Sequence, residues 1–277
     1  MSTEPLVIFY ENSKLDAMHP NTVNYIHSLN VQGWKYKIVG TGEEWKGIIM
    51  SKIKGCLEEL KKLDPNQYVV VTDARDVFCT RSPKHFMKAV NHLSSMDQMI
   101  VSMELFAERL IKYNPNKTYF QVTELSPYLN YHKINNILSQ RKYVNAGLIC
   151  GKAKELIQFY LFALKYDDDQ KALGLYMNTF PEKVVADIDA KILHTSGFGV
   201  NGGFQNRYQI RDSPSISELL GRDSFFLHLP GEANIKGQKF VYDMVKTILK
   251  NFSVKGLDEL YNGYVEREFF SGTTEDV

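Results

Sequence analysis

The stretch that most constrains the fold is an apolar run followed closely by two acids. Residues Tyr68–Thr72 are all β-branched or aromatic, and such a run is typical of a strand buried on both faces within a mostly parallel sheet. Asp73 and Asp76 follow, separated by Ala74 and Arg75. Ligands of open α/β sheets bind beyond the carboxyl ends of the strands. The two carboxylates are therefore candidates for binding one divalent cation, although an acid after a strand often only caps the next turn.

The segments before this strand alternate between strand and helix patterns. Leu6–Tyr10 and Trp34–Val39 are predicted to be strands. Pro20–Leu29 is predicted to be a helix opened by proline, and Lys46–Lys62 a helix with one apolar face. This alternation predicts an α/β fold in which helices flank a central, mostly parallel sheet.

The later part of the chain predicts further elements of the same kind. Strands are expected at Met99–Met103, Ile188–Leu193 (which contains Asp189) and Phe225–His228, and helices after Ser82-Pro83, at Ala153–Tyr166 and from Asp167 to about Tyr176. Residues 144–151 are predicted to form a small-residue turn that leads into a strand. The irregular region 106–143 is expected to be a long excursion, which either contributes to acceptor recognition or only packs against the domain.

Composition and charge exclude several functional classes. The chain has 277 residues, of which 44% are hydrophobic, and a formal net charge of +1. It therefore has neither a broad basic field for nucleic acid nor an acidic tail. We expect no signal peptide and no membrane span, since no run approaches about 18 apolar residues. The three cysteines match no zinc pattern, so reduced thiols and a cytoplasmic location are expected.

Several short motifs are similar to those of one enzyme family and occur in the same order. They are Gly42-Glu43-Glu44-Trp45, the helix-borne Lys52, Asp73-Ala-Arg-Asp76, Ser102-Met-Glu104, Asn145-Ala-Gly147, Asp167-Asp168-Asp169-Gln170, Asp189 and His228-Leu-Pro-Gly231. On these residues the chain resembles the GT-A-type glycosyltransferase domain of procollagen lysyl hydroxylases and related collagen glycosyltransferases. The resemblance extends from about Leu6 to Lys236.

The resemblance implies a single GT-A-type domain over residues 1–277, with a nucleotide-binding half at about 1–105 and an acceptor-side half at about 106–277. It implies Mn²⁺ (with Mg²⁺ as the alternative), a UDP-sugar donor, and a hydroxyl acceptor on a glycan or a hydroxylated side chain. The implied metal ligands are Asp73, Asp76 and His228. The residues expected at the nucleotide and diphosphate are Tyr10, Trp45, Lys52, Arg75, Gly231 and Lys236.

Some of these residues have an alternative interpretation. Lys52 and Lys236 could each place a charge on a diphosphate, but each taken alone is better explained as a solvated surface lysine. Trp45 is either a face for the base or a buried core residue. A lone histidine at a strand end, such as His228, is more often packed or solvated than a metal ligand.

The chain also departs from the family pattern. The family usually has an aromatic residue at the position of Arg75, although the planar guanidinium of arginine can also stack on a base. Gly47-Ile-Ile-Met-Ser replaces a glycine-rich turn, and the family's H-G-N-G has become His228-Leu-Pro-Gly231. The dioxygenase domain of lysyl hydroxylases is absent from this sequence, so we expect no hydroxylation, and a collagen acceptor is not implied.

Four polar residues are the candidates for catalysis and acceptor binding. Asp168 and Asp169 are expected to contact sugar hydroxyls or to act as a general base, although acids at a helix start also serve as caps, and at least one of this acidic run should do so. Glu104 and Asn145 are expected on the acceptor side. Asp189 is equally compatible with a buried structural acid. Inversion and retention of configuration both remain open.

Two other functions compete with glycosyl transfer. A nucleotidyltransferase also places acids and Mg²⁺ at a strand end, but it usually has a basic, glycine-rich loop near the first strand. Residues 11–21 here are poor in glycine, which argues against it. A nucleotide-sugar-binding protein without activity is the second alternative, and the complete set of Asp73, Asp76 and His228 argues against that.

Overall fold

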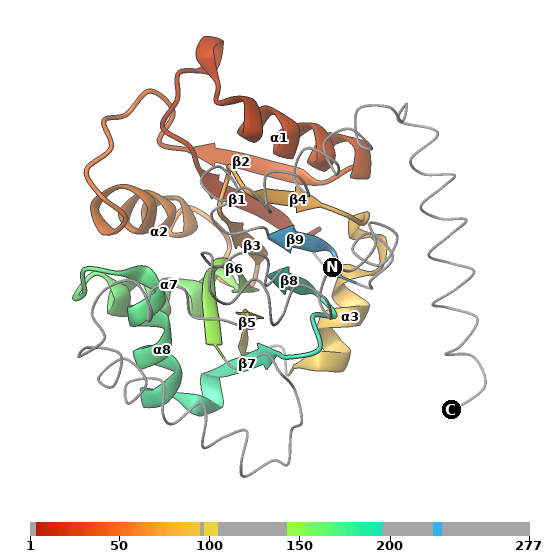
Figure 1. Ribbon diagram of the computed structural model, residues 1–277. Coiled ribbons are helices and arrows are strands. Elements are labelled where there is room, and N and C mark those ends of the chain that lie inside the picture. The colour runs from red at the N-terminus through yellow and green to blue at the C-terminus, as the bar shows by residue number, and fades with distance from the viewer. Residues whose placement is uncertain (1–3, 95–96, 105–142, 196–223, 229–277) are drawn as a thin grey trace, which may run out of the picture.

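The computed structural model describes residues 4–94, 97–104, 143–195 and 224–228. These residues form a nine-stranded sheet with helices on both faces (Figure 1). The strands are β1 (Leu6–Tyr10), β2 (Lys35–Val39), β3 (Tyr68–Thr72), β4 (Val77–Cys79), β5 (Met99–Glu104), β6 (Tyr143–Lys152), β7 (Val184–Asp187), β8 (Leu193–Thr195) and β9 (Phe226–His228). The α-helices are α1 (Pro20–Gln32), α2 (Lys54–Leu60), α3 (Phe86–Leu93), α7 (Ala153–Ala163) and α8 (Asp169–Thr179).

The sheet is mixed and mostly parallel, as the sequence predicts. Its strands lie in the order β2-β1-β3-β6-β5-β8-β9-β4, and β7 pairs with β5 beside this path. β1 is parallel to β2 and β3, and β5 is parallel to β7 and β8. β6 lies antiparallel between β3 and β5. Within the described residues, no helix is long and apolar enough to cross a membrane.

The position of β4 shows that the sheet is strongly curled. Only the four residues Asp73–Asp76 separate the end of β3 from the start of β4, yet β4 stands at the far end of the strand order, paired antiparallel with β9. The strands β3, β6, β5, β8, β9 and β4 therefore form a circuit that this short loop closes. The loop that carries the two acids thus lies where the two ends of this circuit meet.

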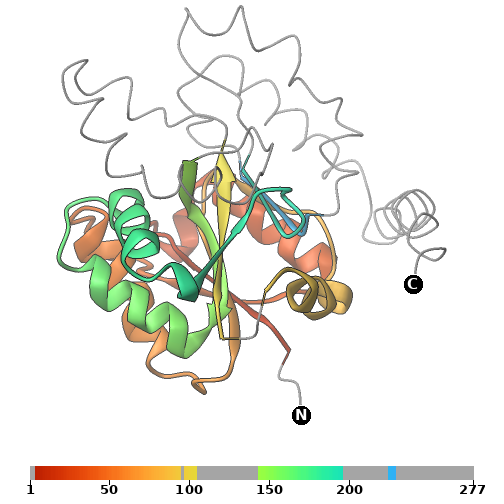
Figure 2. The same cartoon turned by 90° about the horizontal axis from the view of Figure 1, so that it is seen from below.

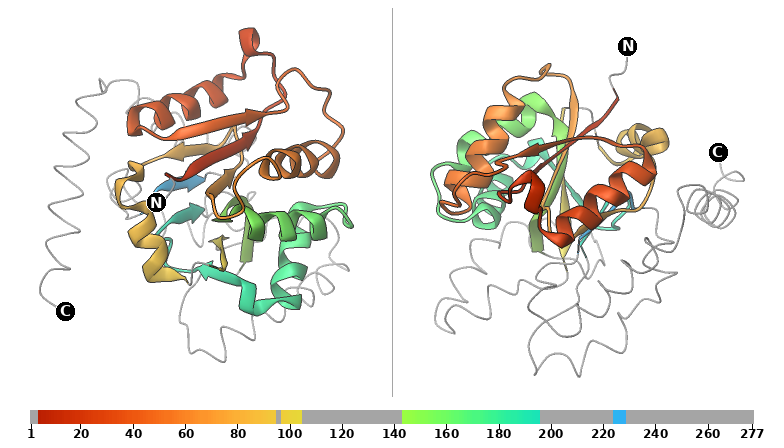
Figure 3. Two further views of the ribbon diagram at one scale, coloured as in Figure 1. Left: turned by 180° about the vertical axis from the view of Figure 1, so that it is seen from behind. Right: turned by 90° about the horizontal axis from the view of Figure 1, so that it is seen from above.

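Helices cover both faces of the sheet (Figures 2 and 3), and a hydrophobic core lies on each face. Helices α2, α7 and α8 pack on one face, where Val69 and Val71 point into the core. Helices α1 and α3 pack on the other, where Tyr68 and Val70 point. Successive strand side chains alternate between faces, so a strand covered on both sides has to be apolar throughout. Burying each valine stabilises the fold by roughly 1.5–3 kcal/mol.

The helix predicted at Lys46–Lys62 is shorter and begins irregularly. It opens with a π-helical turn at Ile49–Ile53 and continues as α2 to Leu60. Gly47 precedes this turn with a φ of 93°, a backbone conformation that favours glycine. The widened turn carries Lys52 on its buried side, and such π-turns occur frequently at functional sites.

Two strand predictions in the second half of the chain are wrong in part. The segment from Val144 to Gly151 was expected to begin with a turn, but it lies wholly within β6. The predicted strand Ile188–Leu193 is instead the turn between β7 and β8, with only Leu193 in a strand. Asp189 is exposed in that turn.

The buried acid of this turn is Asp187, not Asp189. Its carboxylate accepts hydrogen bonds from the backbone N–H groups of Lys191 (2.8 Å), Ile192 (2.7 Å) and Leu193 (2.7 Å). Burial raises its pKa, although these three hydrogen bonds oppose the shift. Asp187 therefore organises the turn that positions β8, and the pattern of apolar residues did not indicate it.

Candidate functional site

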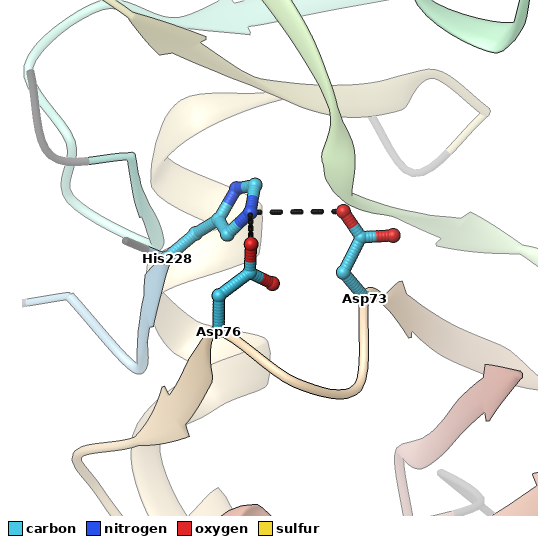
Figure 4. Close-up of side chains that lie close together, drawn as sticks. All are labelled: Asp73, Asp76 and His228. Carbon is cyan, nitrogen blue, oxygen red and sulfur yellow. Dashed lines mark ion pairs between the residues drawn. The ribbon is translucent and has the colours of Figure 1, made fainter. Parts of the chain in front are cut away.

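Two aspartates and a histidine from three parts of the fold converge on one point (Figure 4). Asp73 follows β3, Asp76 precedes β4, and His228 ends β9. His228 Nε2 lies 3.6 Å from Asp73 Oδ2 and 3.4 Å from Asp76 Oδ2. One ligand atom from each of the three residues falls within 4.8 Å of the others. The three side chains therefore lie close together, as expected from the sequence.

The chemistry and spacing of this cluster fit a six-coordinate divalent cation. Octahedral ligands about 2.1 Å from an ion are about 3 Å apart when adjacent and about 4.2 Å apart when opposite, and the three donor atoms have separations of this order. Two carboxylates and an imidazole suit Mn²⁺, which accepts both oxygen and nitrogen ligands. The arrangement also places two negative charges together, which a cation would neutralise.

Gly147 on β6 leaves the room that the cluster needs. A Cβ atom built on Gly147 would lie 2.2 Å from His228 Cε1 and 2.7 Å from Asp73 Oδ2. Any side chain at this position would thus overlap both the imidazole and a carboxylate. Glycine permits close approach to the backbone, and here the approaching groups are the side chains of Asp73 and His228.

Lys52 is buried, which corrects the expectation of a solvated surface lysine. Its side chain is 8% exposed, and its Nζ atom lies 2.6 Å from Asp73 Oδ1 and 2.9 Å from Asp169 Oδ2. Burial disfavours the charged ammonium, but Asp169 and Asp73 more than offset this and raise the pKa of Lys52 well above its usual value. Lys52 therefore connects Asp73, one of the two carboxylates of the cluster, to helix α8.

The two acids at the start of α8 have different surroundings. Asp168 is the N-cap residue, and its Oδ1 atom accepts a hydrogen bond of 2.9 Å from the Lys171 backbone N–H. This agrees with the expectation that at least one acid of the run caps the helix. Asp169 is only 4% exposed and pairs with Lys52. The Asp169 carboxylate therefore holds the buried ammonium group of Lys52, which in turn contacts Asp73 of the Asp73–Asp76–His228 cluster.

A pocket of about 510 Å³ adjoins the two aspartates. Its lining includes Asp73, Asp76, Lys52 and the aromatic side chains of Tyr10 and Trp45. The Trp45 side chain is not a core residue, since 49% of its surface is exposed. Its ring centroid lies 5.7 Å from that of the buried Tyr10. A pocket of this volume holds a small ligand, and its lining offers both carboxylates and an aromatic face.

Arg75 lines the same pocket and is held by a buried acid that the sequence analysis missed. The guanidinium of Arg75 donates to Glu11 from Nε (3.1 Å) and Nη2 (2.7 Å), and Nη2 also donates to Asn12 Oδ1 (3.1 Å). Glu11 additionally accepts from Ser13 and Thr22. A sequence signal existed, because Glu11 follows β1 directly, just as Asp73 follows the neighbouring parallel strand β3.

We expect the Glu11–Arg75 pair to make folding stability depend on acid pH. Burial alone would raise the pKa of the Glu11 carboxyl group. Hydrogen bonds from Arg75, Thr22 and Ser13 outweigh burial and lower this pKa from 4.5 to about 2. Its contribution is therefore fully present above pH 4.5 and is lost as pH falls towards about 2. Glu11→Gln should cost about 2–3 kcal/mol at neutral pH, an amount discounted because Arg75 is half exposed.

Urea denaturation of both proteins at several pH values between 7 and 2.5 measures this effect. The stability difference between wild type and Glu11→Gln should shrink below pH 4.5. The exposed Glu58 offers a matched control, since Glu58→Gln removes the same charge away from the pocket. A Glu11→Gln deficit that stays constant down to pH 2.5 contradicts the expectation.

The remaining predicted residues are placed as follows. Asn145 contacts the metal-ligand cluster, since its Oδ1 atom is 3.0 Å from His228 Nδ1. Glu104 ends β5, and its side chain is outside the described part of the structure. Gly231, Lys236 and the excursion 106–142 also lie outside the described residues.

Comparisons with known proteins found similarity to solved structures only. The chain is similar to a glycosyltransferase involved in the glycosylation of the major capsid of PBCV-1, with 10% identity over 86% of this chain and 98% of that one and a TM-score of 0.43. It is similar to the bifunctional glycosyltransferase WbbM in its apo form (12% identity, 87% of this chain, 51% of that one, TM-score 0.47). It is also similar to mouse xyloside xylosyltransferase 1 in its apo form (7% identity, 83% and 99%, TM-score 0.44). No family model and no curated protein sequence matches the chain.

Proposed function

We propose that the protein is a metal-dependent glycosyltransferase that moves a hexose or pentose from a UDP-sugar to a hydroxyl group of a glycan or a hydroxylated side chain. The observation that carries this proposal is a pocket lined by Asp73, Asp76 and Trp45, whose two aspartates also form a cluster with His228. A nucleoside diphosphate has the same two parts, an anionic diphosphate and an aromatic base. The order of the sequence motifs supports the same assignment.

In this proposal, Asp73, Asp76 and His228 hold Mn²⁺ or Mg²⁺. When bound, the ion supplies Lewis-acid stabilisation of the negative charge that gathers on the departing diphosphate. Lys52 fixes Asp73 by binding its Oδ1 atom, which leaves Oδ2 on the side of His228. Because Lys52 pairs with both Asp73 and Asp169, it offsets only part of the negative charge of these acids, and the cluster still favours a metal cation.

The aromatic residues that line the pocket would bind the base. Trp45 offers an exposed ring face for stacking, and Arg75 offers a planar guanidinium held in place by Glu11 and Asn12. The Tyr10 ring contacts Trp45 and packs against Gly40, where a Cβ atom would lie 2.1 Å from the Tyr10 ring. Asp168, at the start of α8, is the residue that we propose for contact with sugar hydroxyls. Asp169 instead acts indirectly, by holding the Lys52 side chain that contacts Asp73.

Thermal unfolding with and without Mn²⁺ tests the proposal. We expect UDP to raise the melting temperature by several degrees only when Mn²⁺ is present, because a ligand at 100 times its Kd adds about 2.7 kcal/mol. GDP and CTP at the same concentration serve as the controls. A preference for CTP would favour the nucleotidyltransferase alternative, and stabilisation by UDP that is indifferent to metal would contradict the proposed role of the acids.

A donor screen then separates enzyme from binding protein. UDP release would be measured with galactose, glucose, xylose and N-acetylhexosamine donors, each with Mn²⁺ and with a chelator. Release from at least one donor, lost on chelation, is the expected result. Binding of UDP without release from any donor, in the presence or absence of acceptor hydroxyls, would instead support the non-catalytic alternative.

A further inference from the structure

The segment of β6 next to the metal-ligand cluster pairs with β5 in an irregular register. Asn145 pairs with Ser102 of β5, but the next pair is Ile149 with Val101. The register therefore shifts over Ala146–Leu148, and such bulges often occur next to active sites, where they redirect a side chain. Here the bulge contains Gly147, which faces His228, and it begins at the buried Asn145.

Hydrogen bonding identifies which end of the Asn145 amide faces the histidine. One terminal atom of Asn145 lies 2.8 Å from the backbone nitrogen of Gly147. A backbone N–H group can only donate, so this atom has to be the carbonyl oxygen Oδ1. The same oxygen lies 3.0 Å from His228 Nδ1.

This contact determines the protonation of the imidazole ring. Since Oδ1 of Asn145 only accepts hydrogen bonds, Nδ1 of His228 has to carry a proton. In the neutral ring the lone pair then resides on Nε2, the atom that faces Asp73 and Asp76 at 3.6 and 3.4 Å. The opposite tautomer would point an N–H group at the cation position and leave Nδ1 facing the Asn145 oxygen.

We propose that Asn145 is a positioning residue that selects the Nδ1–H tautomer of His228 and so prepares Nε2 for a divalent cation. The inference rests on the proposed metal site. It gives Asn145 a role different from the acceptor-side contact expected from the sequence. Partners that fix the tautomer of a histidine ligand typically change metal affinity by 10- to 100-fold when they are removed.

Two measurements test the proposal without any sugar donor. Mn²⁺ alone would be titrated into wild type, Asn145→Ala and Asn145→Asp, and ¹⁵N-histidine NMR of the metal-free proteins at pH about 8.5 would report the tautomer. The spectrum of His228→Gln identifies the His228 signals among the seven histidines. We expect wild-type His228 to be protonated at Nδ1, and Asn145→Ala to show both tautomers and a 10- to 100-fold weaker affinity for Mn²⁺.

Asn145→Asp is the conservative control, because its carboxylate still accepts hydrogen bonds from Gly147 and His228. We expect it to keep the tautomer and an Mn²⁺ affinity within a few-fold of wild type. A proton on Nε2 in the wild type, or unchanged Mn²⁺ affinity in a folded Asn145→Ala protein, would overturn the proposal. Wild-type protein that binds no Mn²⁺ would instead remove the proposed function, and the tautomer measurement would still decide the role of Asn145.

Discussion

Asp76→Asn is expected to reduce UDP-sugar hydrolysis at least 100-fold while the protein stays folded. The substitution keeps the shape of the side chain but removes one of the two carboxylates of the cluster. Lewis-acid stabilisation of a leaving group is worth several kcal/mol, and each 1.4 kcal/mol corresponds to a factor of ten in rate. Steady-state UDP release at saturating Mn²⁺ measures the effect.

The metal-free stability of this variant gives an independent check. Asp73 and Asp76 repel each other when no cation is present, so Asp76→Asn should be at least as stable as wild type in chelator and should lose the extra stability that Mn²⁺ gives. The exposed Asp167 provides the control, because Asp167→Asn removes the same charge from a solvent-exposed side chain outside the cluster. Full activity of Asp76→Asn would end the metal-site hypothesis.

The largest effect on stability is expected from Lys52→Met. Methionine has a similar length and no charge, so this change leaves Asp169 buried without its cation and Asp73 without its ion pair. Removing one partner from a buried ion pair typically costs about 3–5 kcal/mol. Because the pKa of Lys52 is raised by folding, its contribution is fully present below pH 10.5, and the deficit should be constant from about pH 7 to 9.

Two further variants separate burial of charge from loss of packing. Lys52→Met combined with Asp169→Asn should recover part of the lost stability in urea denaturation, since the uncompensated buried carboxylate is then gone. Lys61→Met, which removes an exposed ion pair with Glu58, should cost less than about 1 kcal/mol. A Lys52→Met deficit as small as that of Lys61→Met would show that the buried pair contributes little.

Local patterns in the sequence were enough to predict the central part of the fold. The apolar run of β3 predicts a strand covered on both faces. In the structure, the side chains of β3 alternate between the two cores. Asp73 and Asp76 could be identified because their position depends only on the strand they follow. Trp45 could not be assigned from pattern alone, because the same residue type serves equally in a core or at a pocket.

Residues that depend on distant partners were harder to predict. Lys52 looks like a surface lysine until Asp169, 117 positions away, is placed beside it. Glu11 and Arg75 are 64 positions apart, and neither has a local motif that indicates the pair. The Asp187 turn was misplaced because Ile188–Leu193 contains enough apolar residues to suggest a strand, whereas three backbone hydrogen bonds to a buried carboxylate determine a turn instead.

The circuit of strands closed by Asp73–Asp76 also bears on how the protein folds. Pairing of β4 with β9 joins residues about 150 positions apart, and contacts of such long separation form slowly because a large loop has to close first. The strands β1, β2 and β3 lie close together in the sequence and can pair early. His228 reaches the two aspartates only when β9 pairs with β4. Acquisition of Mn²⁺ affinity during refolding should therefore lag behind the recovery of helical circular dichroism.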